Sequence, residues 1–373
     1  MEGFAAESIF HNAHLLTEIL QRLPSKSVIR FKSVCKSWRA LIITEYFCLL
    51  WRQHQSPGIL LISRIDYRPH GGYVPLSGPT AGVPQFEIPH DVDDLILQSC
   101  NGFLLYMKLS GTPKYWVYNP ATSEVFVLPQ QLDTCKIHAR RCNCVIVSPC
   151  LAFDSHSRGK VVALAEAAPR NMGGGYVYQV CVTENQGAWR RLGKPSRSRH
   201  SLSTWPVHWH KFIVWIGASV TYFYDVEAEV LRVGASPKCS TSYNSYHLGE
   251  SGGHLHFIDI QGSRLIIKEM KHDLSGWFVK HSIELSQMKA SLFRSIGWDI
   301  NTDAKFKINF LIEEKEDSKL VLGCHDDVVL YRIKDHKSWK LCEWTFTEKC
   351  WIRYFPRFRM HQHVATISRF HNQ

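Results

Sequence analysis

The sequence predicts a small all-α N-terminal domain of three helices, followed by a large all-β domain. Between residues 12 and 52 the apolar residues recur every three or four positions, the period of a helix. From about residue 57 they alternate with polar residues, the period of a strand. The strands recur as hairpins, which favours a β-propeller of six or seven blades. We expect the two domains at residues 10–54 and 57–373.

The first predicted helix has a single apolar face. That face is formed by Leu15, Leu16, Ile19, Leu20 and Leu23. Pro24 is expected to end the helix, because proline lacks the N–H that a continuing helix needs. Ser25 or Ser27 is suited to cap the helix that follows.

Two further helices are predicted from apolar spacings of three and four, with a break near Lys36-Ser37. Their apolar positions are Val28, Phe31, Val34 and Cys35, then Trp38, Leu41 and Ile42. Three short helices in about 40 residues make a very small core. Such a unit is marginal alone and favours a partner surface.

The β region reads as strand–turn–strand units. The expected strand pairs are 115–118 with 125–128, 176–182 with 189–192, 221–225 with 230–233, 254–260 with 265–267, 308–312 with 320–322, and 328–333 with 339–344. Tyr118, Tyr224 and Tyr331 hold equivalent positions, 106 and 107 residues apart. Half that interval is close to the roughly 40 to 50 residues of a propeller blade. A large irregular β-sandwich is the competing architecture, and only residues 286–293 suggest a helical turn or two.

Composition narrows the class of protein without naming its partner. The formal charge is +11, which favours acidic partners of any kind, although a solvated basic surface explains it equally well. No apolar run approaches the roughly 18 residues that span a bilayer, so no membrane partner is expected. The twelve Cys are expected as reduced thiols, and Met1–Ala6 show no signal-peptide pattern, so we expect a cytoplasmic and/or nuclear protein.

The helical segment resembles a known family. Residues 15–24 read LLTEILQRLP, and residues 22–42 read RLPSKSVIRFKSVCKSWRALI, which closely resembles the F-box of plant F-box proteins. The family usually opens with a Leu-Pro pair that helps to seat the F-box on its adaptor, whereas this chain has Asn12-Ala13-His14 there.

The β region resembles, more loosely, the F-box-associated β-propeller region of the same plant family. The matching segments are Ser99-Cys100-Asn101-Gly102-Phe103-Leu104, Tyr118-Asn119-Pro120-Ala121-Thr122 with Leu128-Pro129, Phe153-Asp154 with Lys160-Val161-Val162, and Tyr224-Asp225-Val226-Glu227. Together these segments span most of residues 95–345.

The resemblance implies a non-catalytic receptor subunit of a ubiquitin ligase complex. The F-box would bind a Skp-type adaptor, and through it a cullin scaffold, while the β domain would hold an unidentified substrate protein. The residues expected to bind the adaptor are Leu15, Leu16, Ile19, Leu20, Leu23, Pro24, Val28, Phe31, Val34, Trp38 and Arg39. Seven cations against two anions in residues 12–52 suit an acidic adaptor. Substrate-binding residues are not predicted, and neither a cofactor nor a metal is expected.

Two motifs contain residue types found in catalytic or metal sites. Gly249-Glu250-Ser251-Gly252-Gly253 matches the pattern of hydrolase nucleophiles, but an alternating strand follows where that site needs a helix, so a hairpin is expected. A second cluster has ligand-like residue types in a spacing that is not typical of zinc sites. It consists of Cys135, His138, Cys142 and Cys144.

A basic stretch supports the alternative function. It runs from Arg190 to Arg199 and is either a solvated loop or a site for an acidic ligand. The alternative is therefore a basic β-propeller that binds nucleic acid or an acidic partner and carries a vestigial F-box. In the leading interpretation nucleic acid is not a partner.

Overall fold

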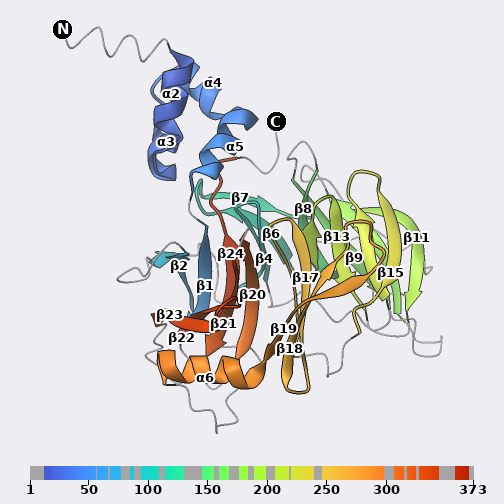
Figure 1. Ribbon diagram of the computed structural model, residues 1–373. Helices are drawn as coiled ribbons and strands as arrows, with labels where there is room; N and C mark the ends of the chain where they lie inside the picture. Colours follow the sequence, from blue (N-terminus) through green and yellow to red (C-terminus); the bar gives the residue numbers. More distant parts are fainter. Residues whose placement is uncertain are drawn as a thin grey trace.

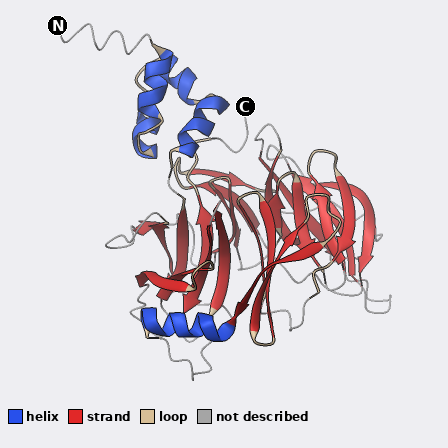
Figure 2. Cartoon of the chain, in the orientation of Figure 1, coloured by secondary structure: helices blue, strands red, loops and turns tan. Residues whose placement is uncertain are grey.

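The structure is a computed structural model, and it describes seventeen segments of the chain. They are residues 12–55, 57–65, 68–76, 85–87, 94–108, 114–129, 145–154, 159–167, 176–183, 189–198, 206–217, 220–238, 246–297, 306–314, 317–324, 327–343 and 358–368. A helical N-terminal domain lies against one end of a ring of β-sheets (Figure 1). Strands dominate the larger part, and one further helix lies at the opposite end (Figure 2).

The described residues of the N-terminal domain form four helices, not the three expected. They are α2 (Ala13–Leu20), α3 (Ser25–Phe31), α4 (Lys36–Ile42) and α5 (Glu45–Gln53). The additional helix is α5, which begins after Thr44, whose Oγ1 accepts a hydrogen bond from the backbone N–H of Phe47. Helix α5 buries Phe47, Cys48 and Trp51 against the other three helices. The prediction failed because apolar residues also lie outside this buried face, at Ile43, Tyr46, Leu49 and Leu50, so residues 43–53 show no clear helical period.

Three helix boundaries also differ from the prediction. Helix α2 ends at Leu20, so Leu23 lies beyond it and Pro24 does not end it. Pro24 itself precedes α3 as its N-cap, and no side chain caps that helix, so the capping role expected for Ser25 or Ser27 is wrong. Proline suits this place because it has no N–H to leave unpaired. The break before α4 lies at residues 32–35 rather than at Lys36-Ser37, because Cys35 is extended and Lys36 already begins the helix.

The β domain contains twenty-four strands in the described segments. In chain order they are β1 (Gly58–Ile65), β2 (Arg68–Pro75), β3 (Gln85–Glu87), β4 (Asp94–Cys100), β5 (Phe103–Lys108), β6 (Lys114–Asn119), β7 (Glu124–Val127), β8 (Val145–Phe153), β9 (Gly159–Ala167), β10 (Tyr176–Thr183), β11 (Arg190–Ser198), β12 (Val207–Trp209), β13 (Phe212–Ile216), β14 (Val220–Asp225), β15 (Val230–Ala235), β16 (His247–Ser251), β17 (His254–Gln261), β18 (Arg264–Met270), β19 (Trp277–Glu284), β20 (Lys307–Glu314), β21 (Asp317–Cys324), β22 (Asp327–Arg332), β23 (Lys337–Glu343) and β24 (Phe358–His363). All six hairpins expected from the alternating pattern are confirmed.

These strands form six antiparallel sheets of four strands each. We name them sheet I (β24-β1-β2-β3), sheet II (β4–β7), sheet III (β8–β11), sheet IV (β12–β15), sheet V (β16–β19) and sheet VI (β20–β23). One end strand of each sheet contacts the corresponding strand of the next, in the closed order β4, β8, β12, β16, β20, β24 and back to β4. The domain is therefore a β-propeller.

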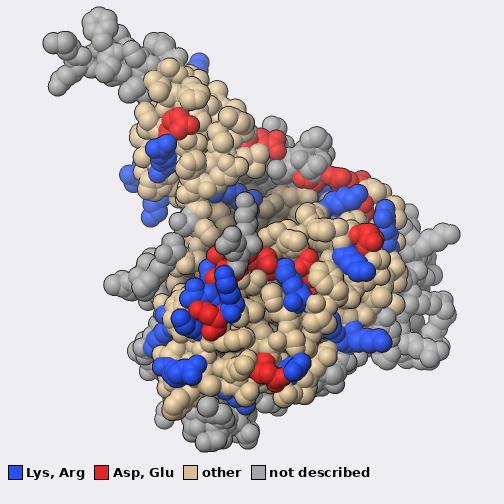
Figure 3. Space-filling model, viewed as in Figure 1, with Lys and Arg blue, Asp and Glu red and all other residues tan. Residues whose placement is uncertain are grey.

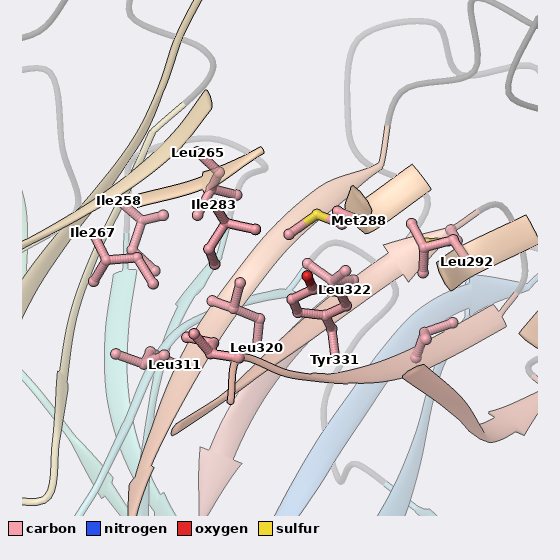
Figure 4. Close-up of a cluster of buried hydrophobic side chains, with 13 residues drawn as sticks. Ile258, Leu265, Ile267, Ile283, Met288, Leu292, Leu311, Leu320, Leu322 and Tyr331 are labelled. Carbon is pink, nitrogen blue, oxygen red and sulfur yellow. The ribbon is translucent and has the colours of Figure 1, made fainter. Parts of the chain in front are cut away.

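The hydrophobic core is divided among the spaces between neighbouring sheets. Each successive pair of sheets shares one buried cluster, including the pair formed by sheets I and II. Figure 4 shows the cluster between sheets V and VI, where Ile258 and Ile267 face Leu311 and Leu320. Helix α6 (Leu285–Ile296) covers one end of this cluster with Met288. Its 12 residues make it longer than the turn or two expected.

The repeat read from tyrosines is also confirmed. Tyr118, Tyr224 and Tyr331 all lie on the third strand of their sheets, β6, β14 and β22. Those sheets are II, IV and VI, so each interval spans two sheets.

A buried ionic network joins sheets V and VI. The Lys280 ammonium on β19 contacts the carboxylates of Glu269, at 2.7 Å, and Glu313, at 2.8 Å. His254 Nδ1 lies 2.7 Å from Glu269, and His256 lies between the two carboxylates at 3.6 Å and 3.5 Å. The side chain of Glu269 is only 8% exposed, so Lys280 neutralises charge that water reaches poorly.

Asp225 fixes the turn between β14 and β15. Its carboxylate accepts hydrogen bonds from the backbone N–H groups of Glu227 and Ala228 and lies 2.9 Å from the Lys211 ammonium. Burial by itself would raise the pKa of Asp225, but these three donors outweigh burial and lower it. The carboxylate therefore stabilises the fold above the ordinary Asp pKa of about 4.

We expect Asp225→Ala to lower the free energy of unfolding at pH 7 by about 2 kcal/mol, because two turn N–H groups lose their acceptor. The loss should shrink as the pH falls through the lowered folded-state pKa, where the wild-type carboxylate becomes protonated. Urea unfolding at pH 7 and pH 3 measures it, with the exposed Glu227→Ala as control. An equal loss at both pH values would contradict this role for the charge.

Candidate adaptor-binding surface of the helical domain

Four of the predicted adaptor-binding residues lie on helix α2, as one pair facing the core and one pair facing away from it. Asn12 caps the helix, its Oδ1 accepting hydrogen bonds from the N–H groups of His14 and Leu15 at 3.1 Å each. Leu16 and Leu20 are buried in the helical core, whereas Leu15 and Ile19 are each 45% exposed. The segment that replaces the Leu-Pro pair thus supplies a helix cap, and the outer pair faces away from the core.

The remaining predicted residues lie on α3, on α4 and in the turns before each of them, and they are buried to three different depths. Val28 is fully buried. Leu23, Phe31 and Trp38 are half-buried at the edge of the core, where the rings of Phe31 and Trp38 meet edge to face at 5.4 Å. The remaining members of the predicted set, Pro24, Val34 and Arg39, are exposed. The predicted set therefore combines core residues with residues that a partner can reach.

Helix α5 adds exposed residues that the sequence reasoning missed. Tyr46 is 68% exposed and Leu49 is 46% exposed, and their spacing of three places them on one face of the helix. Trp51 faces the other way, fully buried, and its Nε1 donates a hydrogen bond to the backbone O of Leu23 at 2.8 Å. One signal in the sequence could have predicted this helix. Thr44 is a typical N-cap residue, and Phe47 and Trp51 follow it four residues apart, at helical spacing.

The surface of the helical domain is also basic. Lys26, Arg30 and Lys36 are exposed, and Arg22 is partly neutralised by Glu18, 3.2 Å away on the same helix. Figure 3 shows blue basic side chains gathered along one side of the helical domain. Apolar side chains among exposed cations suit an acidic partner with an apolar groove.

The helical domain is anchored to the propeller as well. Arg52 at the end of α5 donates a hydrogen bond from Nη1 to Oδ1 of Asn101, in the turn between β4 and β5, at 2.9 Å. Burial in this junction lowers the pKa of Arg52. The two parts of the chain therefore touch through defined contacts.

Comparison with known proteins identifies this domain. Residues 13–50 match the F-box domain. The chain carries an F-box domain. F-box protein At5g07610 of Arabidopsis thaliana is 26% identical over 387 residues, covering 91% of this chain and 88% of that protein. F-box protein At5g49610 of the same plant is 24% identical over 303 residues, covering 74% and 79%. The chain is thus similar to plant F-box proteins over most of its length, including the propeller.

Likeness to solved structures is remote. The β-propeller domain of the Trilobed protease from Pyrococcus furiosus is 10% identical, with 78% of this chain and 98% of that domain covered, at a TM-score of 0.35. The architecture given above rests on the sheets of this chain.

The other sequence motifs fall outside the F-box. Ser251 ends β16 and His254 begins β17, so the motif around Ser251 is a hairpin, as expected. Its hydroxyl accepts a hydrogen bond from the backbone N–H of Glu313 at 2.9 Å. The four-residue Cys/His cluster at 135–144 lies outside the described residues. Within the part that is described, no three His, Cys, Asp or Glu side chains are arranged to hold a metal ion.

The basic stretch at 190–199 is partly described. The Arg190 guanidinium donates two hydrogen bonds to the Glu229 carboxylate, at 3.0 Å and 2.6 Å, and this pairing lowers the pKa of Glu229. One cation of the stretch is therefore engaged within the protein. Residues 190–198 form strand β11 rather than the loop that was one of the two expectations. No helix in the described segments is long and apolar enough to cross a membrane.

Proposed function

We propose that this protein is the substrate-recognition subunit of a Skp–cullin–F-box ubiquitin ligase complex. The F-box, residues 10–54, binds a Skp-type adaptor and through it a cullin scaffold. The propeller, residues 57–373 with six blades, holds the target protein. The ring of six contacting strands supports the blade number.

The observation that carries the proposal is the set of apolar side chains exposed on the F-box. A domain of this size has few residues to place inside, yet Leu15, Ile19 and Val34 are each close to half exposed. Burying such side chains against a partner contributes about 25 cal/mol per Å². We propose that these three, with Pro24, Arg39, Tyr46 and Leu49, form the contact surface, and that Leu16, Leu20 and Val28 act by holding the helices that present it.

The test is the affinity of the full-length protein for a purified Skp-type adaptor, measured by calorimetry. The double variant Leu15→Ala/Ile19→Ala is expected to bind about 30-fold more weakly, because it removes two central apolar contacts while alanine preserves the helix. The matched control is Val230→Ala/Val233→Ala, two valines on β15 that are 48% and 59% exposed.

The control is expected to bind like the wild type. Strong adaptor binding by a protein that lacks residues 1–55 would overturn the proposal, as would the absence of any adaptor binding by the intact protein.

A further inference from the structure

The C-terminal segment takes part in two separate cores. Strand β24 pairs with β1 along six residues and so completes sheet I. The chain then leaves the propeller, and Ile367, only 1% exposed, lies in the hydrophobic core of the F-box. Figure 1 shows β24, in red, running up to α5. Ile367 joins the buried F-box residues Leu16, Leu20, Val28, Ile42, Phe47, Cys48 and Trp51.

Its neighbours tie the same segment to sheet II. Asn119, fully buried at the end of β6, donates a hydrogen bond from Nδ2 to the backbone O of Ser368 at 3.0 Å. Its Oδ1 accepts from the N–H of Ala121, so one amide holds both the β6–β7 turn and the C-terminal segment. Thr366, 2% exposed, packs on Gly102, where an added Cβ would lie 2.5 Å from its Cγ2.

The F-box has reason to need this segment. Four helices of seven to nine residues bury little apolar surface, and units of about 40 residues usually require an additional source of stability. Ile367 supplies a fully enclosed aliphatic side chain, and Ala365 packs against the same cluster. The Arg52–Asn101 hydrogen bond adds a polar contact at the same junction.

We propose that residues 365–368 couple closure of the propeller ring to folding of the F-box, so that the F-box helices reach their native packing only when β24 is seated on β1. The coupling acts through Ile367 inside the F-box and through Thr366 and Ser368 on sheet II. It rests on the proposed function only where adaptor binding is concerned, since the packing itself is intramolecular.

The test is native-state hydrogen exchange of the full-length protein. Ile367→Ala is expected to speed exchange of the α2 and α5 amides by roughly 100-fold, because a buried aliphatic side chain is lost from a small core. Amides in sheets IV and V should keep their wild-type rates. The matched control is Ile283→Ala, equally buried at 1% exposure but between sheets V and VI. It should speed exchange there and leave α2 and α5 protected.

A second variant approaches the junction from the propeller side. Gly102 has φ +82°, and Gly102→Ala would place a Cβ against Thr366. It is expected to displace the C-terminal segment and to speed exchange in α2 and α5 although it lies outside the F-box. Unchanged α2 and α5 rates in both junction variants would overturn the coupling, and so would equal acceleration in the Ile283→Ala control.

Adaptor binding provides a second, functional measurement of the coupling. Ile367→Ala should weaken adaptor binding at least 10-fold although Ile367 is not exposed to a partner. If the wild type binds no adaptor, the proposed function fails while the exchange result still decides the coupling. Wild-type affinity in Ile367→Ala would contradict the coupling alone.

Discussion

Replacing Trp51 with alanine is expected to unfold the F-box while leaving the propeller folded. The indole is fully buried at the centre of the helical core, and its Nε1 satisfies the backbone O of Leu23. Removing a buried Trp side chain costs about 3 to 5 kcal/mol, and the unpaired carbonyl adds about 1 kcal/mol or more. The free energy of unfolding of so small a core is not large enough to absorb this loss, so the F-box should unfold and adaptor binding should be lost.

Hydrogen exchange in α2–α5 and adaptor affinity measure this outcome together. Tyr46→Ala is the matched control on the same helix, because Tyr46 is 68% exposed and adds little to the core. It should leave exchange unchanged and affect only binding. Protected F-box amides in Trp51→Ala would show that the helices do not depend on this side chain.

Replacing Lys280 with methionine is expected to destabilise the propeller by about 3 kcal/mol at pH 7. The substitution keeps the volume of the side chain but leaves Glu269 and Glu313 facing each other without their shared cation. Burial raises the pKa of Glu269, and in the wild type the hydrogen bonds from Lys280 and His254 outweigh burial and lower it. Without Lys280, burial is opposed mainly by His254, so the carboxylate is costly to keep ionised.

The pH dependence of the unfolding free energy follows from these directions of the Glu269 pKa shift. In the wild type, ionised Glu269 stabilises the fold above its ordinary pKa of about 4.3, and this is lost as the pH falls through the lowered folded-state value. In Lys280→Met, protonation of Glu269 at acid pH removes the cost of keeping a buried carboxylate ionised without Lys280. The difference in unfolding free energy should therefore be largest at pH 7 and smaller at pH 4, as measured by urea unfolding. Lys289→Met, an exposed lysine on α6, is the control, and equal losses in both variants would contradict the role of the network.

The hairpins were predictable because their signals are local. Strand alternation, the Asn119-Pro120 turn and the Asp225 turn all act within a few residues, and the structure confirms each. Helix boundaries were less predictable, since Pro24 competes with Ser25 and Ser27 for the capping position and only the packed structure decides. The helix around Phe47 and Trp51 did not stand out, because apolar residues also occupy its other faces.

The division of the F-box residues between core and surface could not be predicted from their pattern. Leu15 and Leu16 are adjacent leucines, yet one is 45% exposed and the other 4%, because only the position of α5 and Ile367 decides which side is covered. Ile367 itself had no local signal. Its contacts join residues some 300 positions apart, and no period in the chain records them.

The position of Ile367 in the chain delays completion of the F-box core during synthesis. The F-box helices leave the ribosome more than 300 residues before Ile367, the residue that completes their core. At about 5–20 residues per second, the intervening chain takes roughly 15 to 60 s to appear. Through that interval the core formed by α2–α5 lacks one of its native side chains, so the nascent chain should be a client for chaperones until Ile367 emerges.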